Sequence, residues 1–221
     1  MSRMHDLQRV LEAGIVAVVR ATDPSNLIEV IRSLAEGGVT VAEVTFTVPG
    51  ALEVIRQARK ELPANVLLGA GTVLDPETAR AALLAGAEFI VSPVVNLEVI
   101  RLCLRYDRLV MPGAFTPTEI LTAWDAGADI VKVFPADNLG PAFFKAMRGP
   151  LPQIRLMPTG GVNLATARDF LEAGACCLGL GSQLVEPAAI AHKNYGRLRD
   201  LAGQYVKIVT DYRLRTHERL N

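Results

Sequence analysis

Two patterns of hydrophobic and polar positions alternate along the chain. Short runs of mostly aliphatic residues, such as 15–19, 66–69, 89–91 and 109–111, are typical of buried strands. Longer segments with an apolar residue at every third or fourth position, such as 51–61 and 97–106, are typical of amphipathic helices. The chain is therefore expected to alternate strands with helices, as parallel α/β folds do.

Capping signals separate the two patterns. Asp23 and Asp75 each precede a proline, which is favoured in the first turn of a helix, and Thr116 with Glu119 forms a capping box. The predicted strands are 15–19, 39–46, 66–69, 89–91, 109–111, 129–136, 154–157 and 176–180.

Strand and helix succeed each other about eight times, which predicts a (β/α)8 TIM barrel of the α/β class. An open doubly wound sheet is the alternative, although it would rarely need so many evenly spaced short strands. We expect one domain over residues 1–221, with a helix at 7–13, the barrel at about 15–187 and a tail of one or two exposed helices at 188–221. In that tail, Arg213, Arg215 and Arg219 are interpreted as a solvated face.

Composition narrows the range of partners and locations. The formal net charge of this 221-residue chain is zero, which argues against nucleic acid or an anionic membrane as a partner. The sequence shows no secretory signal and no stretch long enough to span a bilayer, so a soluble cytoplasmic protein is expected. Cys103, Cys176 and Cys177 lack zinc-type spacing and are interpreted as buried thiols.

Lys132 is the first candidate for chemistry. It lies within the apolar run 129–136, and both faces of a strand in a parallel sheet are covered. Dehydration would lower the pKa of its ammonium group, which makes an amine nucleophilic near neutral pH. The alternative is a structural lysine that extends to the strand end or pairs with an acid.

Glu43 is the second candidate. Alternation along strand 39–46 places Glu43, Thr45 and Thr47 on one face and the apolar residues on the other. Because active sites of barrels lie at the carboxyl ends of the strands, an inward Glu43 and an inward Lys132 would form an acid/base pair around a nucleophile. A buried ion pair that only supports the fold is the alternative.

Glycine pairs end the last two predicted strand regions. Gly160-Gly161 and Gly181 with Ser182 would let backbone N–H groups approach an anion, and the corresponding loops bind phosphate in many barrels. Thr159 and Ser182 could add hydroxyl donors. Tight turns without a ligand are the alternative.

Six short motifs carry a resemblance to a known family. They are Glu43-Val44-Thr45, Gly69-Ala70-Gly71-Thr72, Ser92-Pro93, Met111-Pro112-Gly113, Val131-Lys132-Val133-Phe134-Pro135 and Pro158-Thr159-Gly160-Gly161. Over roughly residues 8–187 the chain resembles the aldolases of 2-keto-3-deoxy-6-phosphogluconate (KDPG) and 4-hydroxy-2-oxoglutarate (KHG).

The resemblance implies a class I, metal- and cofactor-independent lyase that forms a homotrimer. It implies that Lys132 forms a Schiff base with the keto carbon, that Glu43 moves protons and that Thr72 helps to bind the pyruvyl carboxylate. Gly160, Gly161, Gly181 and Ser182 would take the phosphate of a sugar-acid substrate. The full set of expected substrate-binding residues is Arg20, Thr47, Thr72, Pro93, Phe134 and Thr159.

One position departs from the family. Thr47 stands where many members have an arginine that binds the substrate carboxylate, and a threonine cannot supply that charged fork. We expect Arg20, at the end of the first strand, to supply the missing charge.

Other functions remain open from sequence. A phosphate-binding barrel isomerase would share the glycine pairs but would not need Lys132, and a non-catalytic binding barrel would tolerate its loss. An aldolase specific for the epimeric 2-keto-3-deoxy-6-phosphogalactonate would share the whole site. A metal-dependent aldolase is disfavoured because His5, His192 and His217 lie outside the predicted strand ends.

Overall fold

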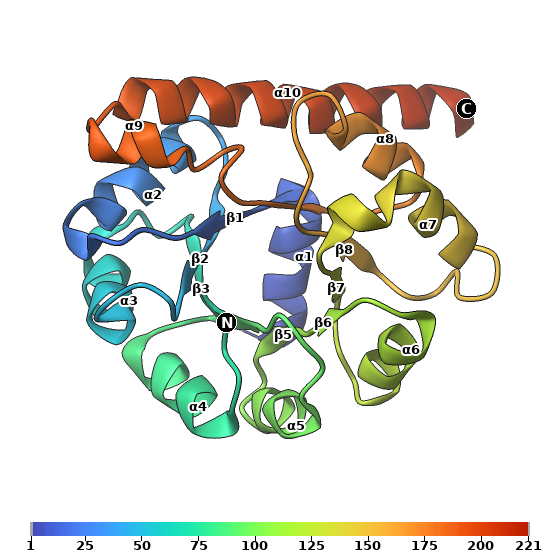
Figure 1. Ribbon diagram of the computed structural model, residues 1–221, viewed down its shortest axis with the longest axis horizontal. Coiled ribbons are helices and arrows are strands. Elements are labelled where there is room, and N and C mark those ends of the chain that lie inside the picture. The colour runs from blue at the N-terminus through green and yellow to red at the C-terminus, as the bar shows by residue number, and fades with distance from the viewer. Residues whose placement is uncertain (1, 221) are drawn as a thin grey trace.

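Parallel strands alternate with helices through the protein (Figure 1). The computed structural model describes residues 2–220, and the side chains of residues 2–216. The strands are β1 (Ile15–Val19), β2 (Val41–Thr45), β3 (Leu67–Gly71), β4 (Phe89–Val91), β5 (Leu109–Met111), β6 (Gly113–Ala114), β7 (Val131–Val133), β8 (Leu156–Pro158) and β9 (Leu178–Leu180).

Helices flank these strands. They are α1 (Arg3–Ala13), α2 (Leu27–Glu36), α3 (Ala51–Glu61), α4 (Pro76–Ala85), α5 (Leu97–Arg105), α6 (Pro117–Asp125), α7 (Gly140–Met147), α8 (Ala167–Glu172), α9 (Pro187–Ala191) and α10 (Tyr195–Leu220). The three predicted caps are present, since Asp23, Asp75 and Thr116 each accept a backbone N–H bond at the start of a helix. The predicted alternation of strand and helix is confirmed.

The strands form two parallel sheets, in the orders β5-β4-β3-β2-β1-β9 and β6-β7-β8. Only Pro112 separates β5 from β6, so one predicted strand position is split between the sheets. On the other side, Thr159 makes an isolated parallel bridge to Gly179 of β9. The α/β class with parallel strands is thus established, and closure into an eight-stranded barrel stays a prediction.

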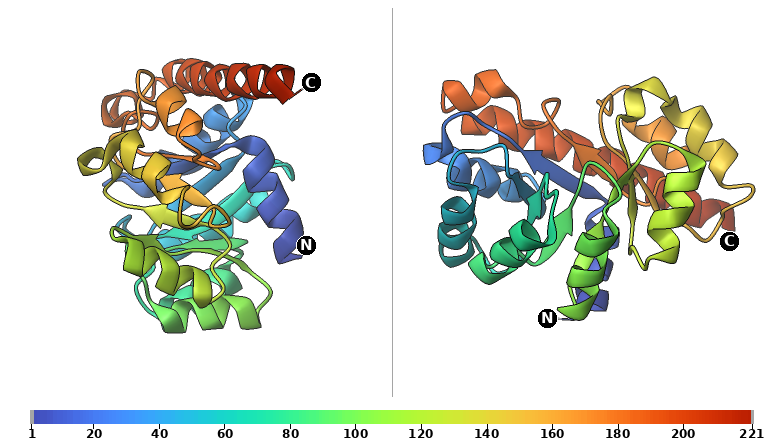
Figure 2. Two further views of the ribbon diagram at one scale, coloured as in Figure 1. Left: turned by 90° about the vertical axis from the view of Figure 1, so that its right-hand side faces the viewer. Right: turned by 60° about the horizontal axis from the view of Figure 1, so that its bottom comes forward.

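Two layers of apolar side chains surround the strands. The larger cluster lies between strands and helices, and contains Val44 and Val131. A second cluster gathers the other faces, and consists of Leu7, Val10, Val16, Val41, Leu67, Phe89, Val91, Leu109, Met111, Ile130, Met157 and Cys177. Because Leu7 and Val10 of α1 belong to it, α1 covers the amino ends of the strands, and Figure 2 shows α1 against one end of them.

Residues 129–136 depart from the predicted strand. Only Val131–Val133 is extended in the sheet, and a 3-10 helix follows at Ala136–Asn138. Pro135 has no N–H to donate, so the ladder of hydrogen bonds ends there. The shorter strand still keeps Lys132 on the same face as Ile130, which belongs to the inner cluster.

The sequence predicts a tail of one or two exposed helices. The tail forms two, α9 and α10, but α10 is not fully exposed. Helix α10 packs along α2 and α8 (Figure 2) and buries one face, formed by Leu198, Leu201, Ala202, Tyr205 and Val209. The burial of this apolar face explains why the predicted exposure is wrong.

The arginines of the tail do not all form a solvated face either. The Arg213 guanidinium donates to the carbonyl oxygens of Leu11 and Glu12, and so caps the end of α1. Arg215 is exposed as expected, whereas the Arg219 side chain lies outside the described part.

Two further expectations can be compared with the structure. Cys103 and Cys177 are buried free thiols as expected, but Cys176 is only half-buried. Within residues 2–220, no helix combines the length and the apolar character that crossing a bilayer requires.

Candidate active site

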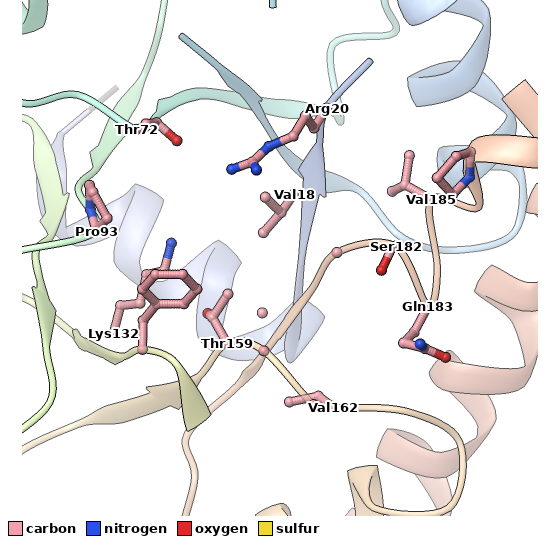
Figure 3. A pocket seen from close by; sticks show the side chains of 16 residues that line it. Val18, Arg20, Thr72, Pro93, Lys132, Thr159, Val162, Ser182, Gln183 and Val185 are labelled. Carbon is pink, nitrogen blue, oxygen red and sulfur yellow. The ribbon is translucent and has the colours of Figure 1, made fainter. Parts of the chain in front are cut away.

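A cavity of about 390 Å³ opens at the carboxyl ends of the strands (Figure 3). We call it the Lys132 cavity. Its walls comprise Val18, Arg20, Thr72, Pro93, Lys132, Phe134, Thr159, Gly160, Gly161, Val162, Gly179, Gly181, Ser182, Gln183, Val185 and Pro187. Residues far apart in the sequence meet here because parallel strands all end on the same side of the sheet.

Lys132 reaches the cavity from β7. Lys132 is 5% exposed, and its Nζ lies 5.0 Å from the centre of the Phe134 ring. Burial lowers the pKa of the amine; Glu43 opposes this shift and the positive charge of Arg20 adds to it. The structure thus provides the dehydration that the sequence predicted for this lysine.

Glu43 lies deeper than the cavity wall. It is 1% exposed, and neither carboxyl oxygen has a hydrogen-bond partner among the described residues. Burial raises its pKa, while the charges of Lys132 and Arg20 lower it. The raised pKa brings this carboxyl group closer to the pH range in which general acid/base catalysis is most effective.

Gly71 makes room for this carboxyl group. A Cβ atom at Gly71 would lie 2.6 Å from Cδ and Oε1 of Glu43, closer than real Cβ contacts. Close packing against Glu43 therefore explains why glycine stands at position 71 of the Gly69-Ala70-Gly71-Thr72 motif, which the sequence alone did not show.

Arg20 extends from the end of β1 into the same cavity. Figure 3 shows its guanidinium group between Thr72 and Val18, on the side of the cavity toward which the Lys132 amine points. Thr72 has a left-handed backbone with φ of 56°, which is uncommon outside glycine. A strained residue beside a buried amine is a common feature of binding sites.

The glycine loops form the opposite side of the cavity. Gly160 and Gly161 have φ of 90° and 72°, and a Cβ at Gly161 would lie 2.4 Å from the Cβ of Asp137. Within the described chain, the N–H groups of Gly160, Gly161 and Ser182 have no protein acceptor. Free N–H groups in such loops suit an anion.

Thr159 adds a buried hydroxyl group between the Arg20 end of the cavity and the glycine loops. Its Oγ is buried without a hydrogen-bond partner among the described residues. A side chain at Gly179 would collide with it, since a Cβ there would lie 2.1 Å from that oxygen. An unpaired buried hydroxyl group beside a cavity needs a polar partner, which a ligand or a water molecule can supply.

The predicted site residues line this cavity with two exceptions, Glu43, which lies behind its wall, and Thr47. Its hydroxyl group lies 2.8 Å from that of Thr45, and it lines a neighbouring groove instead. The threonine is too short to reach the cavity that Arg20 enters from the adjacent strand.

Sequence reasoning missed the apolar part of the wall. Val18, Val162 and Val185 line the cavity, and Gln183 joins them from the loop after β9. Isolated valines resemble core positions in a sequence, so no local signal distinguishes them. In the sequence, only the motif glycines next to these valines indicated a cavity wall there.

Metal-binding side chains do not gather in the described part of the chain. No group of three or more His, Cys, Asp or Glu residues there could hold a metal ion. His192 lies beyond α9, where its Nδ1 is 2.8 Å from the carbonyl oxygen of Ala188.

Fold and site together define a parallel α/β enzyme built around a buried lysine. Residues 7–201 match the family described as KDPG and KHG aldolase, and the chain belongs to that family.

Known proteins resemble the chain over nearly all of its length. It is 34% identical to the 2-dehydro-3-deoxy-phosphogluconate aldolase of Pseudomonas aeruginosa, covering 91% of this chain and 92% of that protein. It is also 34% identical to the KHG/KDPG aldolase of Escherichia coli K12, covering 90% and 94%. The structure of KDPG aldolase from Legionella pneumophila, with pyruvate captured as a covalent carbinolamine, matches with a TM-score of 0.79 at 27% identity, covering 88% and 96%.

Proposed function

We propose that this protein is a class I aldolase that cleaves KDPG to pyruvate and glyceraldehyde 3-phosphate. The observation that carries the proposal is Lys132, a dehydrated amine in the wall of a cavity whose other end offers free N–H groups. The names of the two relatives support KDPG as a substrate, and the second also supports cleavage of KHG to pyruvate and glyoxylate.

Lys132 opens the reaction. Its neutral amine adds to the C2 carbonyl of the substrate, and loss of water gives a protonated imine, which withdraws electrons from C3. The carbinolamine in the Legionella pneumophila enzyme is an adduct of the kind expected in this step. The lowered pKa of Lys132 increases the fraction of neutral amine available.

Glu43 then moves protons. The ionised carboxylate, acting directly or through a water molecule, takes the proton from the C4 hydroxyl group. The C3–C4 bond breaks, its electron pair forms the enamine, and C4 leaves as the aldehyde carbon of glyceraldehyde 3-phosphate. Protonation of C3 and hydrolysis of the imine release pyruvate and restore the amine. This kind of help is worth about 10²–10⁴-fold in rate.

The two ends of the cavity hold the two ends of the substrate. We assign the carboxylate to Arg20 and Thr72, and the phosphate to the free N–H groups of Gly160, Gly161 and Ser182. Thr159 lies between them and is placed to bond a substrate hydroxyl group. Since the galactonate epimer carries the same charged groups, its cleavage stays an alternative.

The finer architecture is part of the proposal. The inner apolar cluster draws side chains from all eight strand positions, and the Thr159–Gly179 bridge links the two sheets. Both observations support a closed (β/α)8 barrel in a single domain. The homotrimer and the cytoplasmic location stay predictions.

Borohydride trapping tests the proposal. Treatment with pyruvate and borohydride should add one reduced pyruvyl group, which peptide mapping should locate on Lys132. Lys132→Met should abolish the adduct, whereas Lys145→Met, which changes an exposed lysine on α7, should keep it. An adduct on another lysine, or none, would contradict the proposal and favour an isomerase or a binding barrel.

A further inference from the structure

A second cavity adjoins the Lys132 cavity and shares Arg20 and Pro187 with it. Its volume is about 650 Å³. We call it the Arg20 groove; its walls include Arg20, Asn26, Thr47 and, just after α9, Lys193. The assigned substrate groups occupy the Lys132 cavity, so this groove has no ligand in the proposed reaction.

Two cationic side chains line the Arg20 groove, Arg20 and Lys193. Its one carboxylate, that of Asp23, already accepts bonds from the Ser25 N–H at 2.9 Å and the Ser25 hydroxyl at 2.8 Å. The bonds from Ser25, and to a lesser extent the charge of Lys193, lower the pKa of Asp23, so the lining carries one net positive charge. Such a lining attracts anions.

Lys193 has an unusual backbone for its side chain. Its φ is 51°, in the left-handed region where glycine or asparagine is favoured at the end of a helix. The N–H of Lys193 bonds the carbonyl oxygen of Ile190 and that of Asn194 bonds the carbonyl oxygen of Ala189, which holds this conformation. A cationic residue in an uncommon backbone conformation is a reason to look for a ligand of opposite charge.

The remaining wall indicates the kind of anion. Ile190 and Ala191 supply an apolar side, and the short Thr47 leaves space that a longer side chain would fill. No Gly-Gly loop lines this groove, unlike the proposed phosphate end of the Lys132 cavity. Arg and Lys side chains bind carboxylates without a nest of backbone N–H groups, so a ligand with carboxylates fits this lining.

We propose that the Arg20 groove binds a small organic polycarboxylate, with one carboxylate on Arg20 and another on Lys193, and that this ligand inhibits the enzyme by occupying Arg20. The inhibition rests on the proposed function, because it requires Arg20 to hold the substrate carboxylate. Binding of the ligand in the groove does not depend on the proposed function.

Electrostatics adds a second link between the two cavities. The charge of Arg20 acts on both Lys132 and Glu43, lowering the pKa of each group. An anion paired with Arg20 offsets that charge. A bound polycarboxylate therefore raises KM through the lost carboxylate contact and moves the pH profile of kcat/KM to higher pH.

Calorimetry with citrate at constant ionic strength tests the binding, with acetate as the monovalent control. Citrate should bind saturably, and Lys193→Gln should weaken it about three- to fivefold, the usual effect of one exposed charge pair. Lys207→Gln, at an exposed lysine of α10 that lines neither cavity, should leave the affinity unchanged. Thr47→Arg should fill the groove and remove the binding.

Citrate could also enter the Lys132 cavity, and Ser182→Asp separates the two sites. Binding that survives Ser182→Asp and weakens in Lys193→Gln supports the groove. Binding lost in Ser182→Asp but unchanged in Lys193→Gln, or no saturation up to about 10 mM citrate, overturns the proposal.

Kinetics then tests the inhibition. Lys193→Gln should keep the wild-type kcat and KM without citrate, and should need about three- to fivefold more citrate for the same rise in KM. Citrate that binds through Lys193 without changing KM would overturn the inhibitory part. Calorimetry needs no turnover, so a failed borohydride test would refute the proposed reaction and leave the groove standing.

Discussion

Lys132 and Glu43 depend on burial for the chemistry proposed here. Burial shifts the pKa of the amine down and that of the carboxyl group up, and each group's charge opposes the shift of the other. Both groups therefore approach the pH range in which they can exchange protons. Arg20 contributes to both values from the neighbouring strand end.

Removing the carboxyl group of Glu43 should slow turnover without preventing adduct formation. We expect Glu43→Gln to lower kcat by about 10²-fold or more, because the amide cannot carry the proton. Slow borohydride trapping at Lys132 should persist. Near-normal kcat in Glu43→Gln would indicate that Glu43 has only a structural role.

Gly71→Ala should impair proton transfer by Glu43, because it displaces the carboxyl group without removing it. The added Cβ would lie 2.6 Å from the Glu43 carboxyl group and must displace it, so kcat should also fall. Gly203→Ala is the matched control, since a Cβ there meets no atom within 4 Å. Equal effects of the two changes would contradict this explanation.

Arg20→Ala should change both affinity and pH dependence. Loss of a charged hydrogen-bond partner should raise KM for KDPG and KHG alike, by roughly 10–150-fold. Because the charge of Arg20 lowers the pKa of Lys132 and of Glu43, its removal raises both. The rising limb of kcat/KM should move to higher pH.

Arg20→Lys keeps the positive charge, so it should shift the rising limb of the kcat/KM pH profile less than Arg20→Ala does. It still loses the bidentate guanidinium contact. An unchanged pH profile in Arg20→Ala, or an effect on only one of the two substrates, would count against Arg20 as the shared carboxylate site.

Helix α1 places an acid at the closed end of the strands. Asp6 is fully buried, and among the described residues its ionic partner is the Arg9 guanidinium, 3.7 Å away. Burial, and next the charge of Glu88, raise its pKa. Packing of α1 thus stabilises the protonated form of Asp6, and this contribution is lost as the pH rises through its raised pKa.

Asp6→Asn should remove that pH dependence. As the pH rises from about 4, near the pKa of an unfolded aspartate, to about 8, the stability and the Tm of the wild type should fall relative to those of the variant. Glu12→Gln, on the exposed face of α1, should follow the wild type. Thermal unfolding across this range measures the difference, and parallel curves for all three proteins would refute the role of Asp6.

In the molecule as a whole, the groups proposed to bind the two charges of the substrate lie at different ends of the Lys132 cavity. Arg20 enters the Lys132 cavity from the end of β1, whereas the free N–H groups come from the loops after β8 and β9. A substrate with a carboxylate at one end and a phosphate at the other matches this arrangement. The same arrangement leaves KHG, which lacks phosphate, with fewer contacts.

Ser182→Asp should therefore discriminate between the substrates. A new negative charge near the phosphate should lower kcat/KM for KDPG by about 10-fold or more. KHG should suffer much less, unless its distal carboxylate uses the same N–H groups. Ser182→Asn, similar in size but neutral, is the control; a KDPG activity unaffected by Ser182→Asp would refute the phosphate assignment.

The sequence by itself determined the order of strands and helices, the caps, and the motifs at the strand ends, because these depend on local periodicity and on the backbone preferences of glycine, proline and capping residues. Lys132, Glu43 and the glycine pairs could be found in this way. The tertiary structure decided the rest. Thr47 falls outside the Lys132 cavity and Arg20 inside it, α10 buries a face that looked solvated, and scattered valines become a cavity wall. These outcomes depend on which distant segments meet, and contacts between distant residues leave no local pattern in one sequence.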